Sequence, residues 1–190
     1  LIVDDIQVGC GRTGPFFSFE PAGIQPDIIC LSKSLSGYGV PLAVVLIKPE
    51  HDVWAPGEHN GTFRGHNPAF VTATAALKFW EDDTLSKDVA RKAQHVTETL
   101  HTIIKQTGVA ASVRGRGLIQ GLAFEDPELA GAVAETCFEH HMVIETAGVQ
   151  RDVLKLLPSL TISNDELTQG LNIIRTSLRA VLEKKSKAAA

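Results

Sequence analysis

Lys33 is the residue whose setting points most directly to chemistry. It follows an apolar run, Asp27-Ile-Ile-Cys-Leu31, and lies among small residues in Ser32-Lys-Ser-Leu-Ser-Gly-Tyr-Gly39. Serines and glycines leave room around the ammonium, and the end of a buried strand holds little water. Such a place favours the neutral amine that forms a Schiff base. The alternative is a phosphate-binding or surface lysine, because most lysines are solvated.

A carboxylate pair, Asp4 and Asp5, ends a second apolar run, Leu1-Ile-Val3. Enzymes that use pyridoxal phosphate need an acidic side chain to keep the pyridinium nitrogen protonated, so that the ring acts as an electron sink. Asp4 is placed for that role. The alternative is a carboxylate that closes a strand-end turn or caps a helix.

Together these residues carry a resemblance to a known family. The stretch Leu-Ile-Val-Asp-Asp-Ile-Gln-Val-Gly-Cys-Gly-Arg-Thr-Gly (1–14) is similar to the Asp-Glu-Val-Gln-x-Gly-x-Gly-Arg-Thr-Gly signature of class III aminotransferases. The Lys33 loop, Gly61-Thr-Phe-Arg-Gly-His-Asn-Pro68 and Arg114-Gly-Arg-Gly-Leu-Ile-Gln-Gly121 agree in order. The resemblance covers essentially the whole chain and implies pyridoxal 5'-phosphate as cofactor.

Position by position, the resemblance implies five cofactor contacts. Lys33 forms the Schiff base and then acts as the general base, while Asp4 pairs with the pyridinium nitrogen. Ile6 packs on the ring face and Gln7 reaches the ring hydroxyl. Thr62 binds the cofactor phosphate, in this family usually that of the neighbouring subunit. These residue types suit the roles, because a β-branched side chain can press on a flat ring and an amide can donate to a phenolate.

The expected reaction is a ping-pong transfer of an amino group to a 2-oxo acid. Three segments narrow the resemblance to the branch that acts on a diamino acid with 2-oxoglutarate, namely residues 31–39, 48–65 and 154–162. Two alternatives stay open. One is another class III enzyme, acting on ornithine, acetylornithine or 4-aminobutyrate, and the other is a non-catalytic piece that serves as an interaction surface.

The acceptor carboxylate requires a cation, and bidentate recognition favours arginine. The candidates are Arg64 and Lys155, of which Lys155 stands three places before Pro158, where many relatives carry an arginine. A solvated strand residue is the alternative for Lys155. Arg114-Gly-Arg116 either binds an anion or marks a tight strand entry. The sequence also offers Arg151 without saying which cation faces a pocket.

We expect these 190 residues to be a C-terminal fragment, because the upstream half of the family pattern is absent from them. That half would supply a phosphate loop and the ring that stacks on the cofactor. The chain alone is therefore expected to show little or no transamination. In the family the cofactor lies at a dimer interface, which implies a homodimer or a higher symmetric oligomer.

Composition describes an ordinary globular protein, with 44% hydrophobic and 21% charged residues. A net charge of −4 without long basic runs gives no support for a nucleic-acid partner. No apolar stretch reaches the ~18 residues of a membrane helix. Three cysteines at no metal-ligand spacing predict a reducing cytoplasm and no metal site, and His140-His141 are expected at the surface of a helix end.

The fold that must position these residues is expected to be α/β. Runs 1–3, 27–31 and 41–47 predict buried strands of a mainly parallel sheet. The family resemblance implies that this sheet is part of a fold type I large domain at residues 1–85. A helix from Ala69 to about Trp80 is predicted, with an apolar stripe of Phe70, Ala73, Leu77 and Trp80 or its neighbours.

Residues 86–190 are expected to form a small α+β domain that includes a connecting helix. That helix is predicted over 86–106, with Ser86 as cap and Gly108 as stop. Further strands are predicted over 112–124, 142–145 and 153–162, and helices over 127–140 and 164–184.

Overall fold

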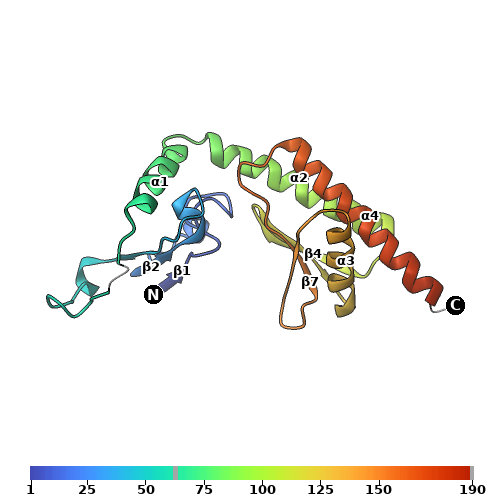
Figure 1. Ribbon diagram of the computed structural model, residues 1–190, viewed down its shortest axis with the longest axis horizontal. Helices are drawn as coiled ribbons and strands as arrows, with labels where there is room; N and C mark the ends of the chain where they lie inside the picture. The colour runs from blue at the N-terminus through green and yellow to red at the C-terminus, as the bar shows by residue number, and fades with distance from the viewer. Residues whose placement is uncertain (62–63, 189–190) are drawn as a thin grey trace. The chain divides into compact units, whose positions relative to one another are not determined.

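The computed structural model describes residues 1–61 and 64–188, which form two compact units, Leu1–Asp88 and Val89–Ala190. Figure 1 shows the helices and strands of both units. Each unit combines a small sheet with helices, so the predicted α/β class is confirmed. No helix among the described residues is both long enough and apolar enough to cross a membrane.

The first unit contains the three predicted strands. They are β1 (Ile2–Asp4), β2 (Ile28–Leu31) and β3 (Val44–Ile47), and their order in the sheet is β1-β2-β3. β1 and β2 run parallel, whereas β3 is antiparallel to β2. Three short 3-10 helices follow strands or loops: η1 (Glu20–Ala22), η2 (Lys33–Ser36) and η3 (Pro49–His51).

The prediction that these strands are buried is wrong for β1 and β3, whereas β2 is half-buried and its last residue, Leu31, is buried. Ile2 on β1 is 65% exposed, and Val45 and Leu46 on β3 are also exposed. Among the residues that the structure describes, one apolar cluster packs against this sheet. Strands of a parallel pair have apolar sequences because they are normally covered on both faces. The members of the cluster are Cys10, Leu31 and Leu35, with Phe16, Phe17, Ile29, Leu42 and Val44 packed against them.

Helix α1 (Asn67–Leu77) and its 3-10 extension η4 (Lys78–Trp80) span the predicted range, but the buried face differs. Ala69 and Ala73 are buried, whereas Phe70 and Leu77, predicted in the stripe, are exposed. Small residues face inward because η2 approaches closely. A Cβ on Gly37 would collide with the Cβ of Ala76.

The second unit holds a four-stranded antiparallel sheet in the order β4-β5-β7-β6. The strand predicted over 112–124 is in fact a hairpin, β4 (Ala111–Arg116) and β5 (Ile119–Phe124). Gly115 and Gly117 have φ of 99° and 57°, which glycine adopts at low cost and which turns the chain back. The other strands are β6 (Glu145–Ala147), three residues later than predicted, and β7 (Val153–Leu156), shorter than predicted.

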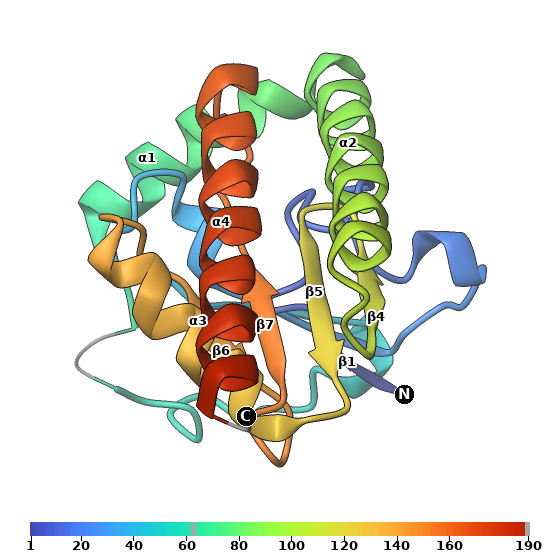
Figure 2. The same ribbon diagram turned by 90° about the vertical axis from the view of Figure 1, so that its right-hand side faces the viewer.

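Three helices complete this unit: α2 (Thr84–Thr107), α3 (Pro127–Glu139) and α4 (Asn164–Ala188). Figure 2 shows α2 and α4 in front of β5 and β7. α2 begins two residues before the predicted cap, because Asp82 accepts a hydrogen bond from the backbone N–H of Thr84. Gly108, with φ of 67°, ends it as predicted. The core consists of fully buried residues of the helices and sheet, among them Val89, Leu100, Ile103, Leu122, Leu154, Ile174 and Leu178.

Candidate functional site

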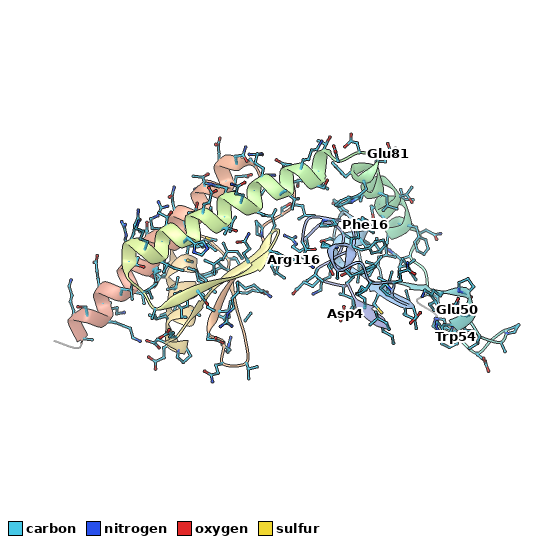
Figure 3. The ribbon with its side chains drawn as sticks, turned by 180° about the vertical axis from the view of Figure 1, so that it is seen from behind. Asp4, Phe16, Glu50, Trp54, Glu81 and Arg116 are labelled. Carbon is cyan, nitrogen blue, oxygen red and sulfur yellow. The ribbon has the colours of Figure 1, made fainter. Side chains whose placement is uncertain are left out.

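The parallel pair β1–β2 brings the two main candidates to one edge of the sheet. Asp4 pairs with Cys30 in the ladder, and the backbone N–H of Asp5 donates to the carbonyl of Cys30 over 2.9 Å. β1 ends at Asp4, and β2 ends at Leu31, two residues before Lys33. The carboxyl ends of neighbouring parallel strands are where ligands bind in open α/β sheets. Figure 3 labels Asp4 at this edge.

The turn that carries Lys33 is unusual in its backbone. Lys33 has φ of 49°, in the left-handed region that non-glycine residues rarely enter. Two serines hold the turn: the Ser32 hydroxyl donates to the carbonyl of Leu42 over 2.5 Å, and the fully buried Ser36 accepts from the backbone N–H of Gly39 over 3.0 Å. Strained backbone of this kind clusters at functional sites.

Lys33 faces a hollow of about 510 Å³ on the first unit, and residues 32–34, 37 and 39–42 line it. The Lys33 side chain is exposed, so the expectation that the strand end excludes water from its amine is wrong for the described residues. The serines and glycines around it leave space but supply no apolar cover. Desolvation of this amine therefore does not come from the residues that surround it here.

The adjacent carboxylates Asp4 and Asp5 have different environments. Asp4 is exposed, and its Oδ1 accepts the backbone N–H of Ile6 over 3.0 Å. Asp5 is only 1% exposed and accepts two hydrogen bonds from Ser18, one from the backbone N–H at 2.9 Å and one from the hydroxyl. Asp5 thus stabilises the fold, while Asp4 stays accessible. Nothing in the sequence pattern indicated Ser18.

The segment after Asp5 carries Ile6 and Gln7, both half-buried. It is held close to Asp5, because the backbone N–H of Gly9 donates to the Asp5 carbonyl over 2.9 Å. Cys10 follows in a buried position, where desolvation and then the charge of Asp5 raise the pKa of its thiol to about 11. Burial also lowers the pKa of Arg12.

The remaining predicted site residues lie in several places. Thr62 lies outside the described residues. Arg64 is exposed in the first unit, and its Nη1 donates to the carbonyl of His59 over 2.7 Å. Lys155 belongs to β7 of the second unit, where its Nζ lies 2.9 Å from Glu145 Oε2. The prediction of a strand position for Lys155 is confirmed, and Glu145 is a partner that sequence reasoning missed.

The other arginines weighed as anion contacts also belong to the second unit. Arg114 and Arg116 are exposed on β4, and the structural role considered for Arg114-Gly-Arg116 matches the hairpin. Arg151, with φ of 57°, lies in the loop before β7. His140 and His141 are exposed at the end of α3, as predicted.

An ion cluster that the sequence did not indicate surrounds Asp27. Lys48 Nζ donates to Asp27 Oδ1 over 2.8 Å, and His51 Nε2 lies 3.7 Å from the same oxygen. The hydrogen bond from Lys48 is the main cause that lowers the pKa of Asp27. Asp27, Glu50 and His51 together offer three ligand-type atoms within 4.8 Å. The Lys48 ammonium already neutralises the carboxylate at its centre.

Comparisons with known proteins agree with the motifs. The family model described as aminotransferase class III matches residues 1–178. A diaminobutyrate–2-oxoglutarate transaminase from Nocardia farcinica is 58% identical over 182 residues, which are 95% of this chain and 42% of that protein. The corresponding protein of Bordetella parapertussis is 57% identical over 192 residues, 100% of this chain and 44% of its own length.

Solved structures of aminotransferases are similar to this chain in fold. The ornithine aminotransferase of Toxoplasma gondii superposes with a TM-score of 0.88 at 29% identity, covering 98% of this chain and 44% of that one. The chain therefore spans less than half the length of the relatives and structures that it matches.

Proposed function

The chain belongs to the class III aminotransferases, and on that premise we propose that it carries the lysine-bearing part of a transaminase that uses pyridoxal 5'-phosphate. The proposed reaction moves an amino group between L-2,4-diaminobutyrate or aspartate semialdehyde and glutamate or 2-oxoglutarate. The relatives that are 57–58% identical are named for this diamino acid and this acceptor. In that interpretation the reaction belongs to ectoine synthesis.

One observation carries the proposal: Asp4 pairs with Cys30, and this register brings the exposed Asp4 carboxylate and the strained Lys33 turn to one edge of β1 and β2. The residues present fit the cofactor. An accessible carboxylate, an accessible amine and a hollow beside that amine are the features that a carbonyl-bearing pyridinium requires.

Each side chain has a defined task in this scheme. The Lys33 amine would hold the carbonyl carbon of the cofactor and, once free, would move a proton to or from the substrate carbon. The Asp4 carboxylate would accept a hydrogen bond from the ring nitrogen and keep it protonated, while Ile6 and Gln7 would orient the ring. The bound cofactor supplies an electron sink for the charge left by that proton. Arg64 and Lys155 are the proposed carboxylate anchors.

We also propose that the first unit is part of the cofactor-binding large domain and that the second is the small C-terminal domain, divided near residue 86. The intact protein would act as a homodimer or a higher oligomer in the cytoplasm. Its isolated C-terminal portion would transaminate little or not at all.

A second candidate function within the family is transamination of ornithine. It is favoured by the structural similarity to the Toxoplasma gondii enzyme, although that similarity comes with 29% identity only. The exposed apolar strands β1 and β3 favour the alternative that this stretch serves chiefly as an interaction surface.

The test is covalent attachment of the cofactor. Pyridoxal phosphate is added to the chain, visible absorption is recorded, borohydride is used to trap the adduct, and the modified lysine is located by mass spectrometry. We expect a visible band and a label on Lys33 that are both absent in Lys33→Ala. Lys78→Ala, which removes an exposed lysine near the end of α1, is the matched control and should keep both. A label spread over many lysines, or one that survives in Lys33→Ala, would refute the assignment.

A further inference from the structure

Lys33 lies in a turn whose two flanking leucines are anchored inside the first unit. Leu31 is 3% exposed and Leu35 is 8% exposed, and both belong to the apolar cluster that includes Cys10. The chain must therefore turn between them, so that both side chains reach the same cluster. Lys33, halfway between the two leucines, is exposed and lines the hollow of about 510 Å³. The turn thus keeps the cluster covered and leaves the amine accessible.

The backbone of this turn is strained at Lys33. Its φ of 49° is in the left-handed region, where the Cβ of a residue crowds the following carbonyl oxygen. Gly37 and Gly39 of the same segment have φ of 71° and 87°, but glycine has no Cβ and adopts such angles readily. A lysine keeps a left-handed conformation only where surrounding contacts hold it there. The orientation of Lys33 therefore depends on contacts made by its neighbours.

The hydroxyl of Ser36 provides such a contact. Ser36 is fully buried, and its hydroxyl donates to the carbonyl of Lys33 over 3.3 Å and accepts the backbone N–H of Gly39 over 3.0 Å. One side chain thus links the first and the last residue of the segment 33–39. Because the hydroxyl is shielded from solvent, it cannot exchange these hydrogen bonds for bonds to water.

Helix α1 blocks the other side of the turn. A Cβ on Gly37 would collide with the Cβ of Ala76, so η2 and α1 are in close contact there. The buried Leu35 fixes the same half of the turn inside the apolar cluster. Residues 35–37 therefore cannot shift easily. If the hydrogen bonds of Ser36 were lost, the turn would relax at Lys33, because that is where its backbone is strained.

We propose that Ser36 is a positioning residue, whose hydroxyl holds the backbone of Lys33 in the left-handed conformation and so directs the amine toward the hollow. This inference rests on the proposed function, in which the Lys33 amine reacts with the carbonyl of the cofactor. Attack on a carbonyl is fast only when the amine approaches it at short distance and in the right direction. Ser36 itself touches neither cofactor nor substrate and acts through Lys33 alone.

The first test measures the backbone of the turn in the chain without cofactor. A positive φ brings the amide hydrogen of a residue close to its own Hα, so Lys33 of the wild type should give a strong NOE between the two. In Ser36→Ala this NOE should weaken as φ relaxes, and the amide hydrogen of Gly39 should exchange with solvent roughly tenfold faster. Ser177→Ala removes an equally buried hydroxyl from α4 of the second unit, and this matched control should change neither signal.

The second test separates the orientation of the Lys33 amine from its accessibility. Pyridoxal phosphate trapped with borohydride reports attack on the carbonyl of the cofactor, whereas acetic anhydride reaches an exposed amine from many directions. Misalignment of a reacting group can cost up to about 100-fold in rate, so Ser36→Ala should take up pyridoxal phosphate at Lys33 about ten- to a hundredfold more slowly than wild type. Acetylation of Lys33 should stay close to wild type, because the amine is exposed in either case.

The fluorescence of Trp80, which packs edge-on against Phe16, shows whether the first unit stays folded in the variant. If Ser36→Ala loses that signal, Ser36→Cys takes its place, because a thiol fills the same position with a weaker donor and acceptor. It should show the same changes to a smaller extent.

An unchanged NOE at Lys33, or equal changes in the two labelling rates, would overturn the role of Ser36. A wild type that takes no pyridoxal label on Lys33 would instead refute the proposed function. The NOE would then still decide whether Ser36 holds the turn.

Discussion

Ser18 donates two hydrogen bonds to the buried carboxylate of Asp5, one from its backbone and one from its hydroxyl. This contact joins the end of β1 to a segment thirteen positions later. Because adjacent residues of a strand point to opposite sides, anchoring Asp5 inward directs Asp4 outward. The local geometry of the candidate site therefore depends on a residue that takes no part in its chemistry.

Replacement of Asp5 should destabilise the first unit. Asp5→Ala removes the acceptor of two hydrogen bonds from the buried Ser18, which costs about 1–3 kcal/mol. Urea unfolding followed by tryptophan fluorescence measures the effect, since Trp54 and Trp80 both lie in this unit. Asp4→Ala, at an exposed position, should cost less than about 1 kcal/mol. Equal losses of unfolding free energy in the two variants would show that the burial of Asp5 does not account for the loss of stability.

Replacing two glycines by alanine should have opposite effects on the stability of the chain. A Cβ on Gly9 would lie 2.7 Å from the Asp5 carbonyl and 2.8 Å from its Oδ2, so Gly9→Ala should destabilise the chain and disturb the Asp5 contact. Gly131 lies within α3 with nothing near its Cβ position, so Gly131→Ala should stabilise by about 0.5–1 kcal/mol. Thermal unfolding of both variants against wild type provides the comparison. A stabilising Gly9→Ala would be incompatible with the close approach.

The start of α3 should contribute a pH-dependent stability. Asp126 caps this helix by accepting the backbone N–H of Glu128, and Lys185 lies 2.5 Å from its other oxygen. The hydrogen bond from Lys185, followed by that from Glu128, lowers the pKa of Asp126. A carboxyl whose pKa is lower in the folded state stabilises the protein above its unfolded pKa of about 3.9, and that stability disappears as the pH falls through the lowered value.

Urea midpoints measured from pH 7 down to pH 2 test this behaviour. Asp126→Ala should lose about 0.5–2 kcal/mol at pH 7, and the gap to wild type should close below about pH 4. Asp126→Asn keeps a capping oxygen but not the charge, so it should lose less. A stability difference between Asp126→Ala and wild type that stays constant across this pH range would contradict a stabilising role for the ionised carboxylate of Asp126.

The three cysteines should differ in reactivity. Burial and the charge of Asp5 raise the pKa of Cys10 to about 11, and burial raises the pKa of Cys137. The thiolate is the form that reacts, so both raised pKa values predict slow modification of Cys10 and Cys137. Cys30 is only half-buried. A thiol reagent should therefore modify one fast site, which Cys30→Ser removes and Cys10→Ser retains. Fast modification of Cys10 would mean that the apolar cluster around it opens readily.

The family, the chemical groups of the candidate site and most of the helices could be predicted from the sequence alone. The motifs around Asp4 and Lys33 are each one continuous stretch of sequence, so they can be recognised without knowledge of the fold. Helix periodicity and stop signals are also local, which is why α2 and α3 are found within two residues of their predicted ends. Gly115 and Gly117 pointed to a turn, although the hairpin around them was predicted as one strand.

Burial, strand register and long-range partners could not be predicted in this way, because they depend on how the elements pack together. The apolar runs of β1 and β3 predicted buried strands, but burial depends on what packs on each face, and Ile2, Val45 and Leu46 stay exposed. Asp4 and Asp5 are equivalent in sequence and differ because Ser18 reaches only one of them. Glu145 and Lys155 meet through strand pairing. Strand pairing follows from packing of the whole sheet, and no local pattern of residues encodes it.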